Sequence, residues 1–157
     1  MTERPDQPAP AGAAARLGHV IKRTEQALIA EKSRALREVG LTVPQYAALL
    51  TLSTSTGMSG AGVARECMVT PQTMSTILAN LEQKGLIERE PSPLHTKVLV
   101  AGLTPDGRAL TAQADALALE VEGRLAREFS DEEQAQLRGL LERAICALGE
   151  RPDGPQD

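Results

Sequence analysis

Hydrophobic residues recur every three or four positions near the start of the chain, with charged residues between them. This spacing predicts one long amphipathic helix that begins at Leu17 and ends near Gly40. Thr42 then has Gln45 three residues later, a capping-box pattern that predicts a second, shorter helix before the Ser/Thr/Gly run 53–57. The stripe of the first helix comprises Leu17, Val20, Ile21, Thr24, Leu28, Ala35 and Val39.

Residues 59–84 carry two further helical stripes separated by a short turn. Ser59 can cap a third helix, and residues 68–69 form the turn. Thr70 followed by Pro71 predicts the start of a fourth helix, because proline at the first helical position lacks only an N–H that would be unpaired there anyway. Gly85 occupies a usual C-terminal position for ending it. The sequence therefore predicts a helix-turn-helix.

Two apolar strands joined by a proline-containing loop follow these helices. The first begins at residues 86–87 and becomes charged over 88–90, and the second contains residues 98–100. Because Pro91-Ser92-Pro93 cannot continue a strand, residues 91–97 are predicted to form the loop of a hairpin. A hairpin placed directly after a helix-turn-helix is a β-wing, so the expected unit is a winged helix-turn-helix.

Two more helices are predicted at the C-terminal end of the chain. Thr104 followed by Pro105 repeats the cap-then-proline start, and Ser130 with Glu133 gives another capping box. Together with the first helix they carry more apolar surface than a small winged domain can cover, so we predict a helical layer that joins two copies of the chain into a homodimer. The apolar positions are Leu110, Ala114, Leu117, Val121 and Leu125, then Leu137, Leu140, Leu141, Ala144, Ile145 and Leu148.

Composition agrees with a core of packed helices. Aromatic residues make up only 1% of the 157 residues, so Leu, Val, Ile, Ala and Met must build the core. This length fits one domain or two small subdomains. The predicted fold class is mainly α with a small β-wing, arranged as a winged helix-turn-helix plus a helical dimerisation layer.

The charge balance argues against a protein that coats nucleic acid through bulk electrostatics. The net charge is −4, which still leaves sequence-specific binding open. Residues 58–103, which contain the predicted helix-turn-helix and wing, carry no net charge, because four basic side chains balance four acidic ones. These are Arg65, Lys84, Arg89 and Lys97 against Glu66, Glu82, Glu88 and Glu90.

The residues that catalysis or metal binding would require are scarce. The chain has two histidines and two cysteines, with no Cys/His spacing for zinc, no Ser/His/Asp pattern and no phosphate-binding glycine loop. We therefore expect no enzyme activity and neither a metal nor a cofactor. Cys67 and Cys146 fall at apolar helical positions and are expected to pack as small apolar residues in a reduced compartment.

No membrane or export signal stands out along the chain. It contains no apolar run of about 18 residues, and its Pro- and Ala-rich start, residues 1–15, lacks the apolar centre of a secretory signal. A cytoplasmic protein with a disordered leader and no membrane contact is expected.

The order of these patterns from Leu17 to about Gly149 resembles the MarR family of bacterial transcriptional regulators. Four segments carry the resemblance. They are Leu41-Thr42-Val43-Pro44-Gln45-Tyr46, Val69-Thr70-Pro71-Gln72-Thr73-Met74-Ser75, Leu81-Glu82-Gln83-Lys84-Gly85-Leu86-Ile87-Glu88-Arg89 and Leu103-Thr104-Pro105-Asp106-Gly107-Arg108.

The resemblance implies an obligate dimer on a pseudo-palindromic site in double-stranded DNA, with half-sites about 10 bp apart. It also implies a repressor that a small aromatic or amphipathic effector releases from DNA. The predicted domains are a disordered leader (1–15), a helical dimerisation region (16–40 with 104–149), the winged helix-turn-helix (41–103) and a disordered tail (150–157), and the resemblance covers all but the two tails.

On the same analogy, the helix that begins at Pro71 enters the major groove and the wing contacts the minor groove or the phosphates. Asn and Gln side chains suit adenine edges, and Lys97 suits a phosphate. Family wings usually carry an Asp-Arg pair, which this chain lacks, so the wing contact rests on other residues. The candidate DNA-binding residues are Thr70, Pro71, Gln72, Thr73, Ser75, Thr76 and Asn80 on the helix, and His95, Thr96 and Lys97 in the wing.

Candidate effector-binding residues are His19, on the first helix, and Tyr46, on a helix that borders the ligand crevice in the family. For Tyr46 the alternative is core packing with a locally bonded hydroxyl.

Two alternative functions remain open. One is a winged-helix protein-interaction module without specific DNA binding, and the other is a thiol-redox regulator that uses Cys67 or Cys146, although relatives that sense oxidants have a cysteine near the first helix.

Overall fold

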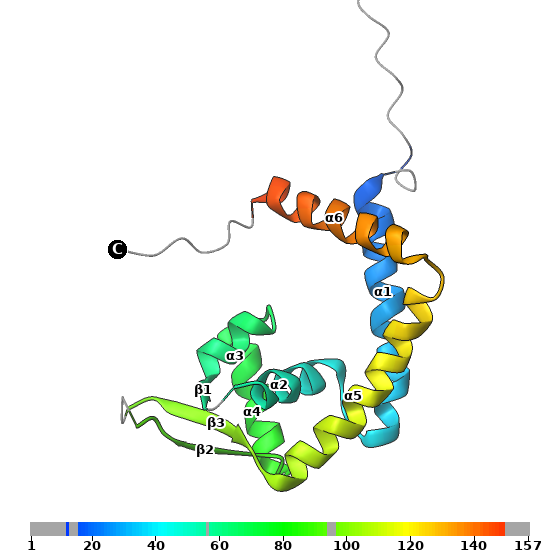
Figure 1. The fold of residues 1–157 in the computed structure, drawn as a ribbon. Helices are drawn as coiled ribbons and strands as arrows, with labels where there is room; N and C mark the ends of the chain where they lie inside the picture. The colour runs from blue at the N-terminus through cyan, green and yellow to red at the C-terminus, as the bar shows by residue number, and fades with distance from the viewer. Residues whose placement is uncertain (1–11, 13–15, 56, 94–96, 150–157) are drawn as a thin grey trace, which may run out of the picture. The chain divides into compact units, whose positions relative to one another are not determined.

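The computed structural model describes residues 12, 16–55, 57–93 and 97–149, and the chain divides into two compact units. Unit 1 is Met1–Ala118 and unit 2 is Leu119–Asp157. Helices α1 (Leu17–Leu36), α2 (Val43–Ser53), α3 (Gly60–Glu66) and α4 (Pro71–Gln83), the 3-10 turn η2 (Arg37–Val39) and the strands β1 (Met58–Ser59), β2 (Ile87–Pro91) and β3 (Leu99–Leu103) lie in unit 1 (Figure 1). Helix α5 (Pro105–Ala126) begins in unit 1, and α6 (Asp131–Leu148) lies in unit 2.

The helix starts follow the capping residues that the sequence predicts. The Thr42 side chain accepts a hydrogen bond from the Gln45 N–H, and the Gln45 side chain accepts one from the Thr42 N–H, which is a complete capping box. Ser130 and Glu133 form the same arrangement at the start of α6. Because each cap satisfies N–H groups that a helix leaves unpaired, these starts are fixed by residues within one turn.

Three antiparallel strands form the sheet, in the order β1-β3-β2. The prediction of two strands was incomplete, because Met58 and Ser59 also pair with Ala101 and Val100 of β3. The expectation that Pro91 ends the first strand was wrong, since Pro91 pairs with Leu99. Because β2 is an edge strand, a proline without an N–H can occupy that position.

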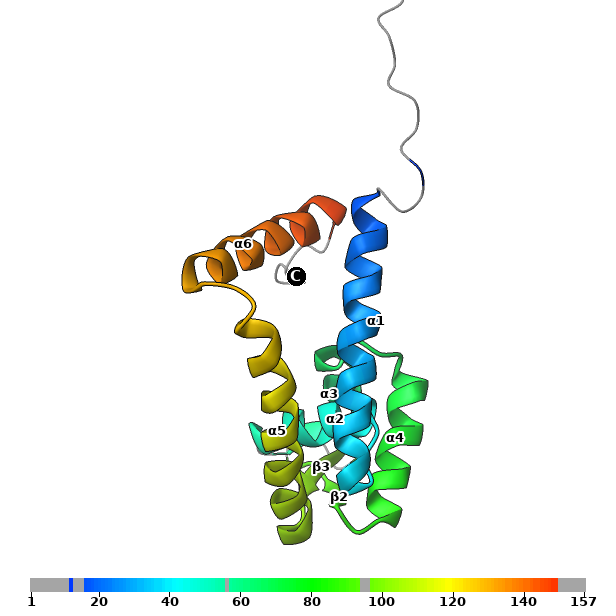
Figure 2. The same ribbon diagram turned by 90° about the vertical axis from the view of Figure 1, so that its right-hand side faces the viewer.

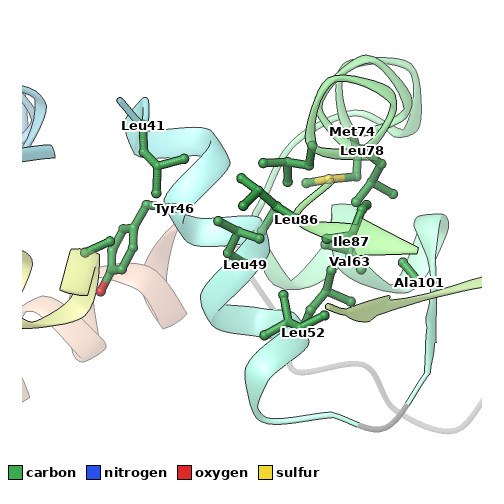
Figure 3. Close-up of a cluster of buried hydrophobic side chains, with 14 of the residues drawn as sticks. Leu41, Tyr46, Leu49, Leu52, Val63, Met74, Leu78, Leu86, Ile87 and Ala101 are labelled. Atoms are coloured by element: carbon green, nitrogen blue, oxygen red, sulfur yellow. The ribbon is translucent and has the colours of Figure 1, made fainter. Parts of the chain in front are cut away.

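The core of unit 1 gathers around α2. This helix packs against α1, α3, α4 and β3, and Figure 2 shows α1 passing in front of it. Leu49 of α2 meets Val63 of α3, Met74 of α4 and Ile87 of β2 in one buried cluster (Figure 3). Helices α2, α3 and α4 and the β2–β3 hairpin therefore share one core. We call residues 41–103, which contain them, the winged unit, and α4 has a fixed position in its core.

Unit 2 contains the end of α5 and all of α6. Within it, the Gln134 side chain donates hydrogen bonds to the carbonyl oxygens of Ala126 and Phe129, at 2.9 and 3.1 Å, and so holds the turn between the two helices. Helix α6 has no buried residue within the single chain. No helix in the described part of the chain combines the length and the apolar composition needed to cross a membrane.

Candidate nucleic-acid interface

The turn between α3 and α4 sets where α4 begins. Met68 has a φ of +54°, the left-handed conformation, and its side chain is 85% exposed. The Val69 N–H donates to the carbonyl oxygen of Ala64 at 3.0 Å, which closes the turn. Thr70 then caps α4 by accepting from the Thr73 N–H at 3.2 Å, and Pro71 follows at the first helical position. The predicted helix-turn-helix is confirmed at these residues.

One side of α4 is buried and the opposite side is open to solvent. Met74, Leu78 and Leu81 are buried in the core. The predicted reading residues are exposed on the first turns of the helix, where a helix-turn-helix protein meets base edges. We call these residues, Gln72, Thr73, Ser75 and Thr76, the reading face.

Two polar side chains join the later part of α4 to the segment that precedes and begins α2. The Gln45 Nε2 donates to the Asn80 Oδ1 at 2.7 Å. The Lys84 Nζ donates to the carbonyl oxygen of Gly40 at 3.1 Å. No periodic pattern in the sequence indicates the Gln45–Asn80 bond, because the two residues are 35 positions apart.

An ion pair joins α4 to β2. The Arg89 Nε donates to the Glu82 carboxylate at 2.9 Å, and the Arg89 Nη2 contacts the same oxygen. Hydrogen bonding from Arg89 lowers the pKa of Glu82 below its usual 4.5, and the same bond raises the pKa of Arg89. Since Glu82 neutralises Arg89, this basic side chain adds little net positive charge near the reading face.

A groove of about 250 Å³ lies between α4, the start of α3 and the hairpin. Ser75 of α4 and Arg89 of β2 are polar groups in its lining, and Leu99 and Ala101 of β3 are among the apolar ones. Ser75 therefore sits at the hairpin side of the reading face.

The wing is described only in part. Lys97 is exposed beside β3, whereas His95 and Thr96 lie outside the described residues. On β2, Glu88 and Glu90 are exposed on the side of the strand opposite Ile87 and Arg89. Carboxylates on this strand would be repelled by DNA phosphates, so Lys97 is the described wing residue suited to a backbone contact.

The two candidate effector-binding residues have different surroundings. Tyr46 belongs to the cluster of buried side chains drawn in Figure 3. Its hydroxyl donates to the Asp115 carboxylate of α5 at 2.7 Å. The alternative of core packing is confirmed for the Tyr46 ring, and Asp115, which accepts from the hydroxyl, is 69 positions away in the sequence. His19 is exposed in the first turn of α1, about 25 Å of helix from Leu36, where α1 ends. No periodic pattern pointed to Asp115 as the partner of Tyr46.

The two cysteines also differ. Cys67 is half-buried against the core, and its Sγ lies 3.6 Å from the Thr51 Oγ1, in line with the packing expected for it. Cys146 is exposed, so the expectation that it packs as a small apolar residue is wrong for the single chain. Within the described ranges no cluster of three or more His, Cys, Asp or Glu side chains could hold a metal ion.

Comparison with known proteins gives the family. Residues 39–97 match the profile of the MarR family. The HTH-type transcriptional repressor Rv2887 of Mycobacterium tuberculosis is 37% identical over 127 residues, which span 81% of this chain and 91% of that protein. The chain belongs to the MarR family. The predictions of family and fold class are confirmed, and this MarR-family chain is a transcriptional regulator of the repressor type, built on a winged helix-turn-helix.

Solved structures of that M. tuberculosis protein match this MarR-family chain along most of its length. The complex with DNA aligns with a TM-score of 0.66 and 36% identity, covering 83% of this chain and 98% of that chain. The complex with salicylic acid aligns with a TM-score of 0.65 and 37% identity, covering 83% of this chain and 96% of that chain. The relative thus has structures with both kinds of partner that the sequence patterns and the resemblance suggested.

Proposed function

We propose that this chain is a homodimeric repressor whose reading face enters the major groove of an operator. In this proposal a small aromatic carboxylate binds the repressor and lowers its affinity for DNA. The observation that carries the proposal is the reading face itself. Four short hydrogen-bonding side chains are exposed on the first turns of a helix whose other side is locked in the core. The DNA complex and the salicylic acid complex of the M. tuberculosis relative support both halves of the proposal.

The reading face favours recognition of sequence over general attraction to DNA. The wider region is neutral, and Arg89 is paired with Glu82. Affinity must then depend on base-edge hydrogen bonds, for which Gln72 suits adenine, together with a few phosphate contacts. We propose Thr70, Pro71 and the reading face as the major-groove contacts, with His95, Thr96 and Lys97 at the wing. Asn80 lies further along α4 and already has a protein partner, so its proposed role differs.

The chain offers a matched pair of variants for testing the reading face. Gln72 and Gln83 are both exposed on α4, and eleven residues of helix place them within about 20° of the same side. Only Gln72 lies at the N-terminal end that meets base edges in this class of motif. Gln72→Ala should therefore weaken operator binding by at least about tenfold, whereas Gln83→Ala should change it little.

The measurement is fluorescence anisotropy of the dimer on a labelled inverted repeat selected from a random duplex library, beside a scrambled duplex and across a salt series. Gln72→Ala should leave binding to the scrambled duplex unchanged, because phosphate contacts carry that binding. Equal binding of the unaltered chain to every duplex would contradict the proposal and favour a protein-interaction module.

The effector half of the proposal is tested on the same complex. Sodium salicylate should lower operator affinity, while salicylamide, which lacks the carboxylate, and sodium chloride at equal ionic strength should not. We place the effector site beside Tyr46, with His19 as a second candidate, as a proposal from the family resemblance. The proposed role is regulatory with no catalytic step, and it is carried out where bacterial DNA lies, in the cytoplasm.

A further inference from the structure

The first turn of α2 is connected on two sides, to α4 and to α5. Gln45 donates to Asn80 of α4, and the next residue, Tyr46, donates to Asp115 of α5. Both donor-acceptor distances are 2.7 Å. Neighbouring residues of one helical turn thus join the proposed effector side of the winged unit to the helix that reads DNA.

The Gln45 side chain is held in one orientation. Its Oε1 accepts from the Thr42 N–H at 3.0 Å, while its Nε2 donates to Asn80. The backbone N–H of Gln45 is bonded as well, to the Thr42 Oγ1 at 3.3 Å. The planar Gln45 amide cannot rotate without losing one of these bonds, because both its oxygen and its nitrogen are bonded. A shift of the first turn of α2 therefore also shifts Asn80.

Lys84 directly follows the last residue of α4 and lies one turn after Asn80, on the same side of the helix. Lys84 bonds the carbonyl oxygen of Gly40, so both side chains tie this flank of α4 to the short segment 40–45. Asn80 follows Gln72 by eight residues, which turns it about 80° around the helix and about 12 Å along it. The bond therefore acts on the flank of α4, away from the centre of the exposed side.

Tyr46 gives the same turn its second attachment. The side chain is buried, so the first turn of α2 cannot shift relative to α5 without disturbing the Tyr46–Asp115 bond. Because the capping box makes this turn stiff, a displacement of Tyr46 also displaces Gln45. The two bonds are then two ends of one connection between α5 and α4.

We infer that Gln45 is a positioning residue for operator recognition, which holds α4 through Asn80 and passes to α4 any shift that an effector causes at the Tyr46–Asp115 bond. This inference rests on the proposed function. It assigns Asn80 to the support of the reading face, and it makes a specific claim about energy coupling between Gln45 and Asn80.

A double-mutant cycle on operator affinity tests that claim. Gln45→Ala and Asn80→Ala should each weaken operator binding by about threefold to tenfold, the usual range for one lost hydrogen bond. The double variant should be no weaker than either single variant, because both remove the same bond. If the two losses multiply, Asn80 contacts DNA independently of Gln45 and the inference is overturned.

Two further variants separate positioning from helix capping. Thr42→Ala removes a capping bond of α2 but leaves the Gln45–Asn80 bond, so its operator affinity should stay within about twofold of the unaltered chain. Gln45→Glu should restore binding, because its carboxylate can accept from the Thr42 N–H and, after the Asn80 amide turns over, from Asn80 as well. Equal losses in Thr42→Ala and Gln45→Ala, or no rescue by Gln45→Glu, would overturn the inference.

The coupling to the effector has its own readout. Salicylate should lower operator affinity less in Gln45→Ala than in the unaltered chain, while calorimetry without DNA shows the same salicylate affinity in both. An unchanged salicylate response in Gln45→Ala would overturn the inference alone. An unaltered chain that binds its operator but ignores salicylate would overturn the effector half of the proposed function, and the inference with it.

Discussion

Gly107 shows how strictly one residue can be constrained by its backbone neighbours. A Cβ atom added there would lie 1.9 Å from the carbonyl oxygen of Leu86. That oxygen also accepts from the Thr104 N–H, so it cannot move aside without breaking the bond that joins the residue before α5 to the residue before β2. Gly107→Ala should therefore lower the free energy of unfolding by about 3 kcal/mol, as overpacking against the backbone does.

Chemical denaturation of Gly107→Ala measures this loss, and Gly102→Ala is its control. Gly102 lies in β3 with open space around its Cα, so alanine fits there and should be neutral or slightly stabilising. Equal unfolding free energies for the two variants would show that α5 can begin in another position.

Met68 is a second residue at which the backbone conformation determines how a substitution changes the free energy of unfolding. It holds the left-handed conformation that glycine adopts freely, and its exposed side chain has little packing to lose. Met68→Gly should raise the free energy of unfolding by about 1 kcal/mol. Gly85 is the matched case, also left-handed with open space, so Gly85→Ala should lower it by a similar amount. A thermal shift of the same sign in both variants would contradict this account.

At the scale of elements, the Glu82–Arg89 pair joins α4 to the hairpin and makes stability depend on pH. The pKa of Glu82 is lower in the folded chain than its usual 4.5, so the contribution of the pair is complete above that pH. It is lost as the pH falls through the lowered pKa, when Glu82 becomes protonated. Glu82→Gln should therefore remove part of the acid-induced loss of stability below pH 4.5.

The test is to measure unfolding curves of Glu82→Gln and of the unaltered chain between pH 3 and pH 7. This range spans the ordinary titration of carboxylates. Glu120→Gln serves as a control carboxylate, since it lies on α5 outside the α4–hairpin junction. If the free energy of unfolding falls as steeply with decreasing pH in Glu82→Gln as in the unaltered chain, the ion pair does not stabilise the junction.

The wing gives a prediction about DNA affinity. Lys97 is exposed at the end of the hairpin beside β3, where a phosphate contact would be independent of base sequence. Lys97→Gln should weaken binding to all duplexes alike and reduce the slope of log affinity against log salt by about one. Lys22→Gln, a change of the same charge on α1, should leave that slope unchanged, and anisotropy titrations across a salt series compare the two.

The sequence predicted those elements whose signals lie within one turn of the chain. Thr42, Thr70 and Ser130 cap helices at the expected positions, because a cap needs only the next three residues. Strand β1 was missed because two residues carry no periodicity, and its pairing with β3 depends on residues 41 or more positions away.

The candidate site was predictable to the same extent. The exposure of the reading face follows from helical spacing alone, since its members lie opposite the apolar stripe. The partners of Gln45 and Tyr46 did not follow, because Asn80 and Asp115 approach them only when distant helices pack together. Long-range pairs of polar side chains leave no repeating pattern in a single sequence.

For the whole molecule, the apolar residues left exposed indicate where a second copy is needed. Helix α6 exposes Leu137, Leu140, Leu141, Ile145 and Leu148, and α1 exposes Leu17, Val20, Ile21 and Ile29. Patches of this kind on a regulator with one reading helix per chain fit a homodimer. In the free chain Leu140 is 57% exposed, so a charge there should leave the single chain folded.

Leu140→Glu should therefore separate the dimer without unfolding the chain, because each copy would have to bury an unpaired carboxylate in the interface. Sedimentation equilibrium should show a dimer dissociation constant raised by at least about 100-fold. Circular dichroism should show unchanged helical content. Gln136→Glu adds the same charge to α6 at a polar, exposed position and should leave the dimer intact.

Loss of the dimer should weaken operator binding far more than any single contact does. In the dimer the two α4 helices are spaced by about one DNA turn, so once one is bound the other meets the second half-site at a high effective concentration. This raises operator affinity by about 10²- to 10⁴-fold. A single copy of Leu140→Glu keeps its reading face intact and should still bind one half-site weakly. Full operator affinity in a chain that sedimentation shows to be monomeric would mean that one winged unit suffices, and that the exposed apolar residues of α1 and α6 serve another purpose.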